Sequence, residues 1–319
     1  MKILATGSYL PTGKLSNDDL SQRVDTNDEW ITSRTGIRNR HVVIDENTSD
    51  LATKAAHAAL KNAGIHEAQV QLIIVATSTP DGLIPGVAHQ VLKNLGIEQA
   101  MAFDVNAACT GFVYALDVAT SLVQAHGYKY ALVIGAEVMS KVIDWTDRNT
   151  CVLFGDGAGA VVLENVADNH FLYTKCRAIP DVEDVLVSGE IAVNHPLFNS
   201  DSNDFYLRMK GQDVFKFAVC VVCESMTEAA AETGISLEAV DYYILHQANS
   251  RIMEYVARKL QLPEQKFYST IADTGNTSAA SIPIVLDKMW RAGDLKSGMK
   301  LMLTGFGAGL TYATILLRW

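Results

Sequence analysis

Cysteine is scarce in this sequence, and its arrangement is not that of a disulfide-stabilised scaffold. Five cysteines occur in 319 residues, an odd number without framework spacing. Cys220 and Cys223 have CxxC spacing, but no second cysteine pair or nearby histidine accompanies them, so we expect core packing rather than metal or redox chemistry. Few, unpaired thiols are typical of a reducing compartment, and we therefore expect a cytoplasmic protein.

Positive charge is outweighed by negative charge, which limits the possible partners. Lysine and arginine number 26 against 36 aspartates and glutamates, giving a net charge of −10. Binding to nucleic acid requires a basic face that displaces counterions, so we expect no nucleic-acid partner. An acidic partner would need a local basic patch on this acidic chain.

Long hydrophobic runs are absent as well. The sequence has no unbroken stretch of about 18 apolar residues of the kind that spans a membrane. Gly7 and Pro11 interrupt the apolar start too early for a secretory signal. Apolar residues nevertheless make up 49% of the chain and charged residues 19%. This balance predicts a globular protein with a large core and no membrane partner.

Cys109 lies where an apolar, extended run meets a helix, in the stretch Phe103–Phe112 (FDVNAACTGF). Unpaired N–H groups and the helix dipole at that helix end favour negative charge, which predicts a thiolate, the nucleophilic form of cysteine. The small residues on both sides let the chain turn sharply and let a substrate approach. The alternative is a buried, inert cysteine, which is commoner. The choice between them depends on what the rest of the chain supplies.

Trp30 lies in a polar, helix-like stretch, residues 16–34, and arginines follow it at positions 34, 38 and 40. An exposed tryptophan beside arginines is suited to stack a planar ring and to hold phosphates. The alternative is a half-buried tryptophan beside a solvated, charged face. Residues after this stretch are more regular, with an amphipathic helix predicted from Thr48 to Gly64.

The order of elements in the first half of the chain recurs in the second half. A helix, a short link and an apolar strand occupy residues 48–77 and again 214–246. A strand, a glycine-rich turn and an apolar strand occupy 130–163 and again 300–317. This repetition of alternating helices and strands predicts an α/β fold that arose by internal duplication.

A weakly patterned stretch, residues 164–207, separates the two repeats. We therefore predict two halves, residues 1–165 and 166–319, with reactive groups at strand ends where the halves meet. In the second half, His246 follows an apolar strand and Asn276 precedes a helix. Alone, these would be a structural histidine and a helix cap. Together with the cysteine they form a nucleophile flanked by two polar groups.

Several short motifs occur in one order along the chain: Asp28–Ile31, Arg34–Arg38, Phe103–Phe112, Thr146–Arg148, Phe154–Gly159, His246–Asn249, Gly275–Ser278 and Gly305–Gly307. Through these motifs the whole chain resembles the β-ketoacyl-acyl carrier protein synthase III family of the thiolase-like fold. The resemblance implies two duplicated halves in a layered α-β-α-β-α core. It also implies an acyltransferase that initiates fatty acid synthesis, with a homodimeric assembly.

The implied reaction is a decarboxylative Claisen condensation. An acyl group, typically from acetyl-CoA, moves onto Cys109, and malonyl-acyl carrier protein then loses CO₂ and attacks it to give a 3-oxoacyl product. By resemblance, His246 and Asn276 donate N–H groups to the enolate oxygen. Asparagine has no basic atom, which indicates charge stabilisation rather than proton removal. Backbone N–H groups of Cys109 and Ala308 would hold the acyl oxyanion, with strain if Ala308 required a positive φ. No metal or cofactor is implied, because acyl-CoA is a substrate.

The resemblance also assigns residues to binding. The CoA-binding and tunnel residues would be Trp30 and Arg148 around the adenine, Arg34 at a phosphate, Asn249 near the pantetheine arm and Phe306 in the tunnel. The acyl pocket would include Phe154, and Ile84 would reach the pocket of the partner subunit. Some relatives carry a bulkier aromatic residue in place of Ile84. The smaller isoleucine could leave room for branched or longer acyl primers, so the primer preference is left open. A basic patch for the acidic carrier protein would comprise Lys216, Arg251, Arg258 and Lys259, whose alternative is solvated helix faces.

Other readings of the same residues remain. A thiolase is disfavoured because no cysteine follows Cys223, and an elongating synthase because Asn276 occupies the place of a second histidine. A related synthase of a specialised biosynthetic pathway is the main alternative. A non-enzymatic acyl-CoA-binding scaffold and a Cys/His hydrolase are two further ones, and product analysis separates them.

Overall fold

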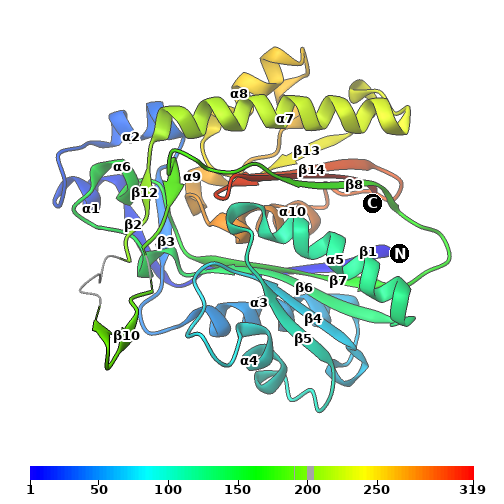
Figure 1. The fold of residues 1–319 in the computed structure, drawn as a ribbon. Coiled ribbons are helices and arrows are strands. Elements are labelled where there is room, and N and C mark those ends of the chain that lie inside the picture. Colours follow the sequence, from blue (N-terminus) through cyan, green and yellow to red (C-terminus); the bar gives the residue numbers. More distant parts are fainter. Residues whose placement is uncertain (190, 200–204) are drawn as a thin grey trace.

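The computed structural model describes residues 1–189, 191–199 and 205–319, and its main elements form five layers (Figure 1). Two β-sheets lie face to face with two helices between them, and further helices cover the outer face of each sheet. The central helices are α5 (Gly111–His126) and α10 (Ser281–Ala292). The outer helices are α3 (Thr48–Ala63) and α4 (Val87–Asn94) on one side, and α7 (Gly211–Thr233) and α8 (Ser250–Lys259) on the other.

The two sheets share one strand order, which confirms the predicted duplication. The first sheet has the order β1-β7-β6-β4-β5, and the second has β8-β15-β14-β13. The strands of the first sheet are β1 (Lys2–Tyr9), β4 (Leu72–Ala76), β5 (Met101–Val105), β6 (Tyr130–Glu137) and β7 (Gly157–Glu164). Those of the second are β8 (Phe171–Ala178), β13 (Tyr242–Leu245), β14 (Lys300–Gly307) and β15 (Thr311–Arg318).

The pairing within the sheets repeats as well. Strands β6 and β7 form an antiparallel pair, as do β14 and β15, while β4 runs parallel to β6 and β13 runs parallel to β14. Short 3₁₀ turns introduce both central helices, η2 (Ala108–Thr110) before α5 and η6 (Ser278–Ala280) before α10. The turn that carries the cysteine therefore has a counterpart in the second half.

Helix ends follow local chemistry. Asn47 caps α3 by accepting from the backbone, and Gly64 ends that helix with φ of 66°. The polar stretch 16–34 is not one helix, because Asn27 caps a second one; it divides into α1 (Asn17–Ser21) and α2 (Asp28–Thr35). Shorter elements are β2 (Gly13–Ser16), β3 (Asn39–Val42), α6 (Arg148–Cys151), β9 (Leu186–Val187), β10 (Asn194–His195), β11 (Phe198–Asn199), β12 (Arg208–Met209) and α9 (Ile271–Thr274).

The stretch 164–207 contains more structure than its weak pattern predicted. It includes β8, the edge strand that corresponds to β1, and most of β8 is only half-buried. Partial burial removes the clean alternation by which a strand is found in a sequence. The division of the chain near residue 165 into two separate units stays a prediction.

Among the longer helices that the structure describes, α5 is the most apolar. Within the described residues, the segment Ala108–His126 is the one helix with the length and composition to cross a membrane. It lies between the two sheets (Figure 1), and its buried side chains belong to the cluster that joins them. Such a position is that of a core helix in a layered protein.

Candidate active site

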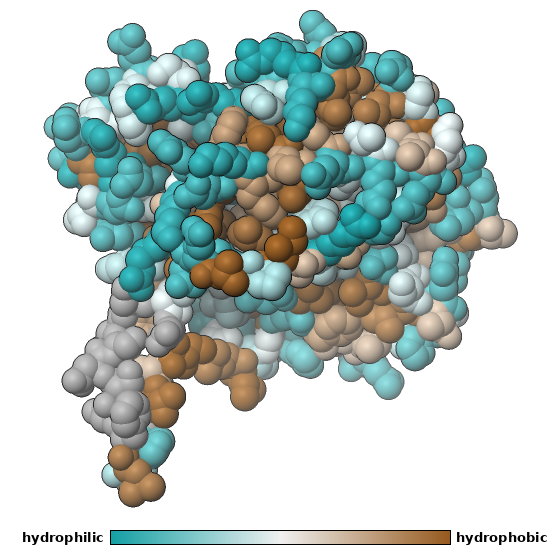
Figure 2. Space-filling view, turned by 45° about the horizontal axis from the view of Figure 1, so that its top comes forward, coloured by the Kyte–Doolittle hydropathy of each residue, from teal (hydrophilic) through white to brown (hydrophobic). Residues whose placement is uncertain are grey.

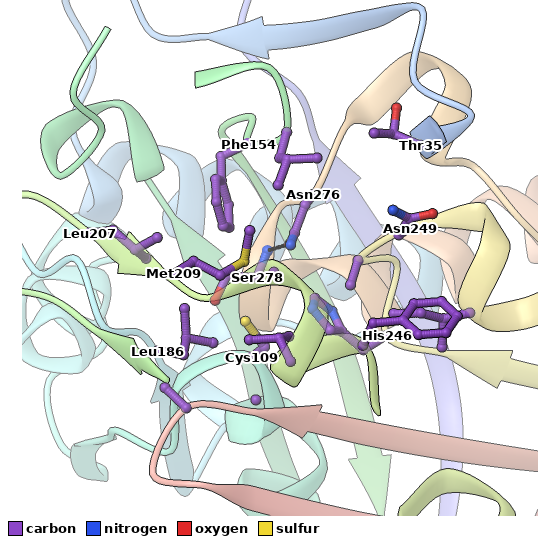
Figure 3. A pocket seen from close by; sticks show the side chains of 18 of the residues that line it. Thr35, Cys109, Phe154, Leu186, Leu207, Met209, His246, Asn249, Asn276 and Ser278 are labelled. Atoms are coloured by element: carbon purple, nitrogen blue, oxygen red, sulfur yellow. Dashed lines mark hydrogen bonds between the residues drawn. The ribbon is translucent and has the colours of Figure 1, made fainter. Parts of the chain in front are cut away.

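Cys109, His246 and Asn276 line one cavity of about 400 Å³. Cys109 lies in η2 before α5, His246 follows β13, and Asn276 lies just before η6, so both halves of the chain contribute. Figure 3 shows the three side chains around the same space. The structure therefore brings together the three residues that the sequence singled out, and their chemical roles stay predictions.

The turn that carries Cys109 is tightly packed against β14. Ala108, immediately before it, has a positive φ of 45°, a conformation that persists only where surrounding structure enforces it. A Cβ added to Gly307 would lie 2.9 Å from the Cys109 Cβ and 3.0 Å from its backbone nitrogen. Glycine at this position is thus what allows the strand to approach the turn.

Cys109 is a neutral thiol in the folded protein. Desolvation by the surrounding protein raises the pKa of the thiol to about 12, while the neighbouring Ser278 hydroxyl lowers it and the Glu137 carboxylate raises it further. The predicted resting thiolate is therefore wrong, because removal from water outweighs the favourable end of the helix. The proton must leave when the sulfur attacks.

His246 is buried and uncharged. Its Nδ1 lies 2.8 Å from the Ser281 hydroxyl, and its ring meets the edge of the Phe306 ring at a centroid distance of 5.1 Å. Burial lowers the pKa of His246 to about 3. The Ser281 hydroxyl also accepts the N–H of Gln247 at 3.4 Å, and we assign its own proton to the bond with Nδ1 because the other ring nitrogen then carries its proton toward the cavity. That assignment leaves the ring proton on Nε2 as a free donor.

Asn276 is fixed by its backbone and by its own side chain. Its N–H donates to the Leu153 carbonyl at 2.8 Å, and its carbonyl accepts from Gly155 at 3.0 Å. The side-chain Oδ1 accepts from the backbone N–H of Ser278 at 2.8 Å. Since the oxygen of the amide is occupied, its NH₂ group is the part left to act as a donor.

Two groups beside Cys109 were not singled out from the sequence. Ser278 lines the cavity, and its hydroxyl donates to the carboxylate of Glu137 at 3.0 Å. Glu137 is fully buried at the end of β6. Desolvation raises the pKa of its carboxyl group, and hydrogen bonds from Thr79 and Ser78 oppose that rise. The available signal in the sequence was one acidic residue closing an otherwise apolar strand.

Comparison with known proteins decides the family. Models of 3-oxoacyl-[acyl-carrier-protein (ACP)] synthase III and of its C-terminal part match residues 103–179 and 230–319. The β-ketoacyl-[acyl-carrier-protein] synthase III of Neisseria meningitidis is 47% identical over 321 residues, which cover 100% of this chain and 99% of the relative. That of Clostridium acetobutylicum is 44% identical over 322 residues, covering 100% and 98%. The chain belongs to the β-ketoacyl-[acyl-carrier-protein] synthase III family.

Solved structures confirm the predicted thiolase-like fold. The synthase III of Aquifex aeolicus has a TM-score of 0.93 and 44% sequence identity, covering 100% of this chain and 99% of that chain. The priming β-ketosynthase of the R1128 polyketide pathway also matches, with a TM-score of 0.92 over 99% and 95% of the chains but 33% identity. The lower identity to the polyketide enzyme does not favour the specialised-pathway alternative.

The residues that the synthase III resemblance assigned to CoA lie at or beside the cavity. Trp30, Arg34, Asn249 and Phe306 line it. The guanidinium groups of Arg34 and Arg148 each lie 4.8 Å from the Trp30 ring centroid. A planar base between Trp30 and Arg148 would need two contacts of about 3.5 Å each, so the arginine must shift to admit one.

Arg40 does not belong with the arginines that could meet phosphate. It is fully buried and donates to the carbonyl groups of Leu15 and Val152 and to the side chain of Asn17. Its position shows that it ties β3 to neighbouring segments of the fold. Arg34 and Arg148, beside Trp30, are exposed to a ligand, and Arg38 is exposed as well.

The remaining predicted site residues differ in position. Phe154 is buried and lines the cavity. Ala308 lines it as well, and its φ is not positive, so its backbone does not carry the strain that a positive φ would impose on alanine. Ile84 is 92% exposed and does not line the cavity of its own chain. Figure 2 shows apolar side chains on this face of the molecule, around a central hollow and on a projecting segment.

The four basic residues do not form one compact group. Arg251 is exposed at the start of α8 and lines the mouth of the cavity. Arg258 and Lys259 lie at the other end of that helix, about 10 Å along its axis. Lys216 is exposed on α7 and paired with Asp213 at 3.0 Å. Arg251 is therefore the member placed to meet a ligand that enters the cavity.

Proposed function

We propose that this protein condenses an acyl-CoA primer with malonyl-acyl carrier protein to give 3-oxoacyl-acyl carrier protein and CO₂, the first condensation of fatty acid synthesis. The observation that carries the proposal is the common cavity of Cys109, His246 and Asn276 in a chain of the synthase III family. A neutral histidine and an amide beside a thiol suit enolate chemistry.

In the first half-reaction the sulfur of Cys109 attacks the thioester carbonyl. Backbone N–H groups of Cys109 and Ala308 stabilise the oxyanion, and both residues line the cavity. A thiolate then leaves as free CoA. Because one thioester replaces another, the step is close to thermoneutral and reversible.

In the second half-reaction malonyl-acyl carrier protein loses CO₂ and becomes an enolate. Nε2–H of His246 and the NH₂ group of Asn276 donate to the enolate oxygen, each worth about 10²–10³ in rate. The enolate carbon attacks the acyl carbonyl, and Cys109 leaves. The low pKa of His246, about 3, keeps it a neutral donor throughout. These steps use backbone and side-chain groups of the protein and call for no added cofactor or metal.

CoA enters between Trp30 and the cysteine. Arg34 and Arg148, both stacked on Trp30, supply positive charge for the phosphates and a planar surface for the adenine. Asn249, at the N-cap of α8, borders the route of the pantetheine arm. Phe306 closes the tunnel wall beside His246.

The acyl chain occupies the end of the cavity near Phe154, and Ile84 from the partner subunit of a homodimer completes it. The support for the dimer is the exposure of apolar side chains that a monomer would not favour, at Leu83 (74%), Ile84 (92%) and Leu197 (92%). All five cysteines are free, which agrees with a cytoplasmic location. Arg251 and its basic neighbours on α7 and α8 meet the acidic carrier protein.

The test is to incubate the protein with acetyl-CoA labelled in the acetyl group and then add malonyl-acyl carrier protein. We expect label on the wild-type protein, none on Cys109→Ala, and transfer of the label into 3-oxobutyryl-acyl carrier protein. Release of free acetate as the sole product would indicate a hydrolase. Binding without covalent labelling would indicate an acyl-CoA-binding scaffold.

A further inference from the structure

Glu137 is a buried carboxylate to which the steps above give no role. It is fully buried, and within the described part of the chain it forms no salt bridge. Its two oxygens instead accept hydrogen bonds from the hydroxyl groups of Thr77 (3.2 Å), Ser78 (3.0 Å), Thr79 and Ser278 (3.0 Å) and from the backbone of Ser78 and Thr79 (both 3.1 Å). A shell made only of donors is that of an ionised carboxylate.

Ser278 connects this carboxylate to the nucleophile. Its hydroxyl donates to Oε1 of Glu137, and the turn η6 that carries it packs against the turn η2 that carries Cys109, both residues lining the cavity. Figure 3 shows Ser278 and Cys109 as neighbours on the cavity wall. Since the proton of Ser278 is directed at Glu137, the lone pairs of its oxygen are free to face the thiol.

The backbone at Ser278 is held in an unfavourable conformation. Its φ is 48°, a value rare for a residue with a side chain, and the bond from its N–H to Oδ1 of Asn276 fixes it there. This turn is the counterpart of the one that presents Cys109. Strained backbone of this kind concentrates at functional sites.

We propose that Ser278 and Glu137 form a proton relay for Cys109, an inference that rests on the proposed acyl transfer. As the sulfur attacks the thioester, its S–H bond breaks and the proton passes to Oγ of Ser278. The hydroxyl proton of Ser278 passes at the same time to Oε1 of Glu137. The sulfur electron pair forms the new bond to the acyl carbon, and CoA leaves as a thiolate that takes a proton from water.

The condensation step reverses the relay. When the enolate attacks, the bond between the acyl carbon and the sulfur breaks, and its electron pair returns to Cys109. The proton held on Glu137 then returns through Ser278 and restores the neutral thiol. The full cycle consumes one proton from water for each CO₂ released, as the overall reaction requires.

The other candidate base is less suited to this proton. Nδ1 of His246 is occupied by Ser281 at 2.8 Å, and the remaining ring nitrogen carries the proton that the enolate needs. Burial lowers the pKa of His246 to about 3, which makes the ring a weak base. Burial has the opposite effect on Glu137, whose raised pKa makes the carboxylate a better acceptor.

The test compares Ser278→Ala and Ser278→Gly with wild type in the acylation step alone, by rapid mixing with labelled acetyl-CoA. Glycine tolerates the positive φ, so that variant removes the hydroxyl without strain. We expect acylation at pH 7 to fall about 10²–10⁴-fold, the usual contribution of a general base. Glu137→Gln is expected to show the same loss, while Thr6→Val, which removes a hydroxyl donor to the buried Asp287 away from the cavity, acylates like wild type.

Two further readouts exclude a merely structural role. The acylation rate of wild type is expected to be independent of pH between about pH 6 and 8. In the serine variants the rate should rise about tenfold per pH unit, in proportion to the thiolate fraction of Cys109. Acyl-enzyme isolated after long incubation is expected to release CO₂ from malonyl-acyl carrier protein within threefold of the wild-type rate, because decarboxylation does not use the proton of Cys109. Unchanged acylation in both serine variants, or equal loss of acylation and of CO₂ release, would overturn the relay. Failure of wild-type protein to acylate or condense would instead overturn the proposed function.

Discussion

At the scale of single residues, the site depends on which groups remain uncharged. Cys109 and His246 are both held neutral by burial, with pKa values moved to about 12 and about 3. In water a free thiol and a free imidazole would each titrate within about two units of neutral pH. Here the histidine keeps its Nε2 proton for an incoming oxygen, and the thiol loses its proton only during reaction.

The neutral histidine predicts a pH dependence of stability. The pKa of His246 is about 3 when folded and about 6.5 when unfolded, so the unfolded chain binds the proton more tightly. Its contribution to stability is complete above pH 6.5 and is lost as the pH falls toward 3, at about 1 kcal/mol per unit. The free energy of unfolding, measured with denaturant between pH 7 and 5, should therefore fall less in His246→Gln than in wild type.

The control for that measurement is His57→Gln, which changes an exposed histidine of α3. The free energy of unfolding of this variant should fall with decreasing pH as steeply as that of wild type. A His246→Gln variant that loses stability as steeply as wild type would mean that the buried ring is not the group responsible.

At the scale of elements, the approach of β14 to η2 sets the position of the nucleophile. Gly307→Ala places a methyl group 2.9 Å from the Cys109 Cβ. We expect a loss of stability of about 1–3 kcal/mol and at least a tenfold loss of acylation, because the turn must move. Labelling by acetyl-CoA and denaturant unfolding measure the two effects.

Gly96→Ala serves as the control with a similar loss of stability. Gly96 has a φ of 68° after α4 and has no heavy atom within 4 Å of an added Cβ. Alanine there costs about 1 kcal/mol through backbone strain. The acylation rate of Gly96→Ala should equal that of wild type. An equal loss of acylation in Gly96→Ala and Gly307→Ala would mean that lower stability alone explains the slower reaction.

The sequence predicted those elements whose ends are determined by residues close by in the chain, such as a glycine after the last turn of a helix. Helices α3 and α5 end at Gly64 and Gly127, each with a φ of 66°, as their sequences indicate. Strand β8 was missed because an exposed edge gives little alternation, and α1 and α2 were merged because both are polar. The pairing of Glu137 with Ser278 spans 141 positions, so no local pattern contains it.

At the scale of the whole molecule, an acidic enzyme must bind an acidic carrier protein. The net charge is −10, and Arg251 lies at the mouth of the cavity. Arg251→Glu should raise the KM for malonyl-acyl carrier protein about tenfold, more at low salt, and leave acylation by acetyl-CoA within threefold. Steady-state kinetics at two salt concentrations measure the change.

The matched control is Lys93→Glu, an exposed residue of α4 on the opposite outer layer (Figure 1). It makes the same change in net charge and should leave both constants unaltered. Equal effects of the two substitutions would indicate general repulsion by net charge and contradict a patch at α8.

Assembly is the other property of the whole molecule. Light scattering should give about twice the mass of one chain, and Ile84→Asp should weaken the dimer because the side chain, 92% exposed in one chain, would be buried in an assembly. A monomer of full condensing activity would contradict both the dimer and the part given to Ile84 in the pocket.

The most direct measurement of the central claim separates the two half-reactions in single turnovers of His246→Ala and Asn276→Ala. If these side chains stabilise the enolate, both variants should form acyl-Cys109 at near the wild-type rate. Release of CO₂ from malonyl-acyl carrier protein should then fall by about 10²–10³ for each. Loss of acylation as complete as in Cys109→Ala, or unchanged release of CO₂, would contradict the account.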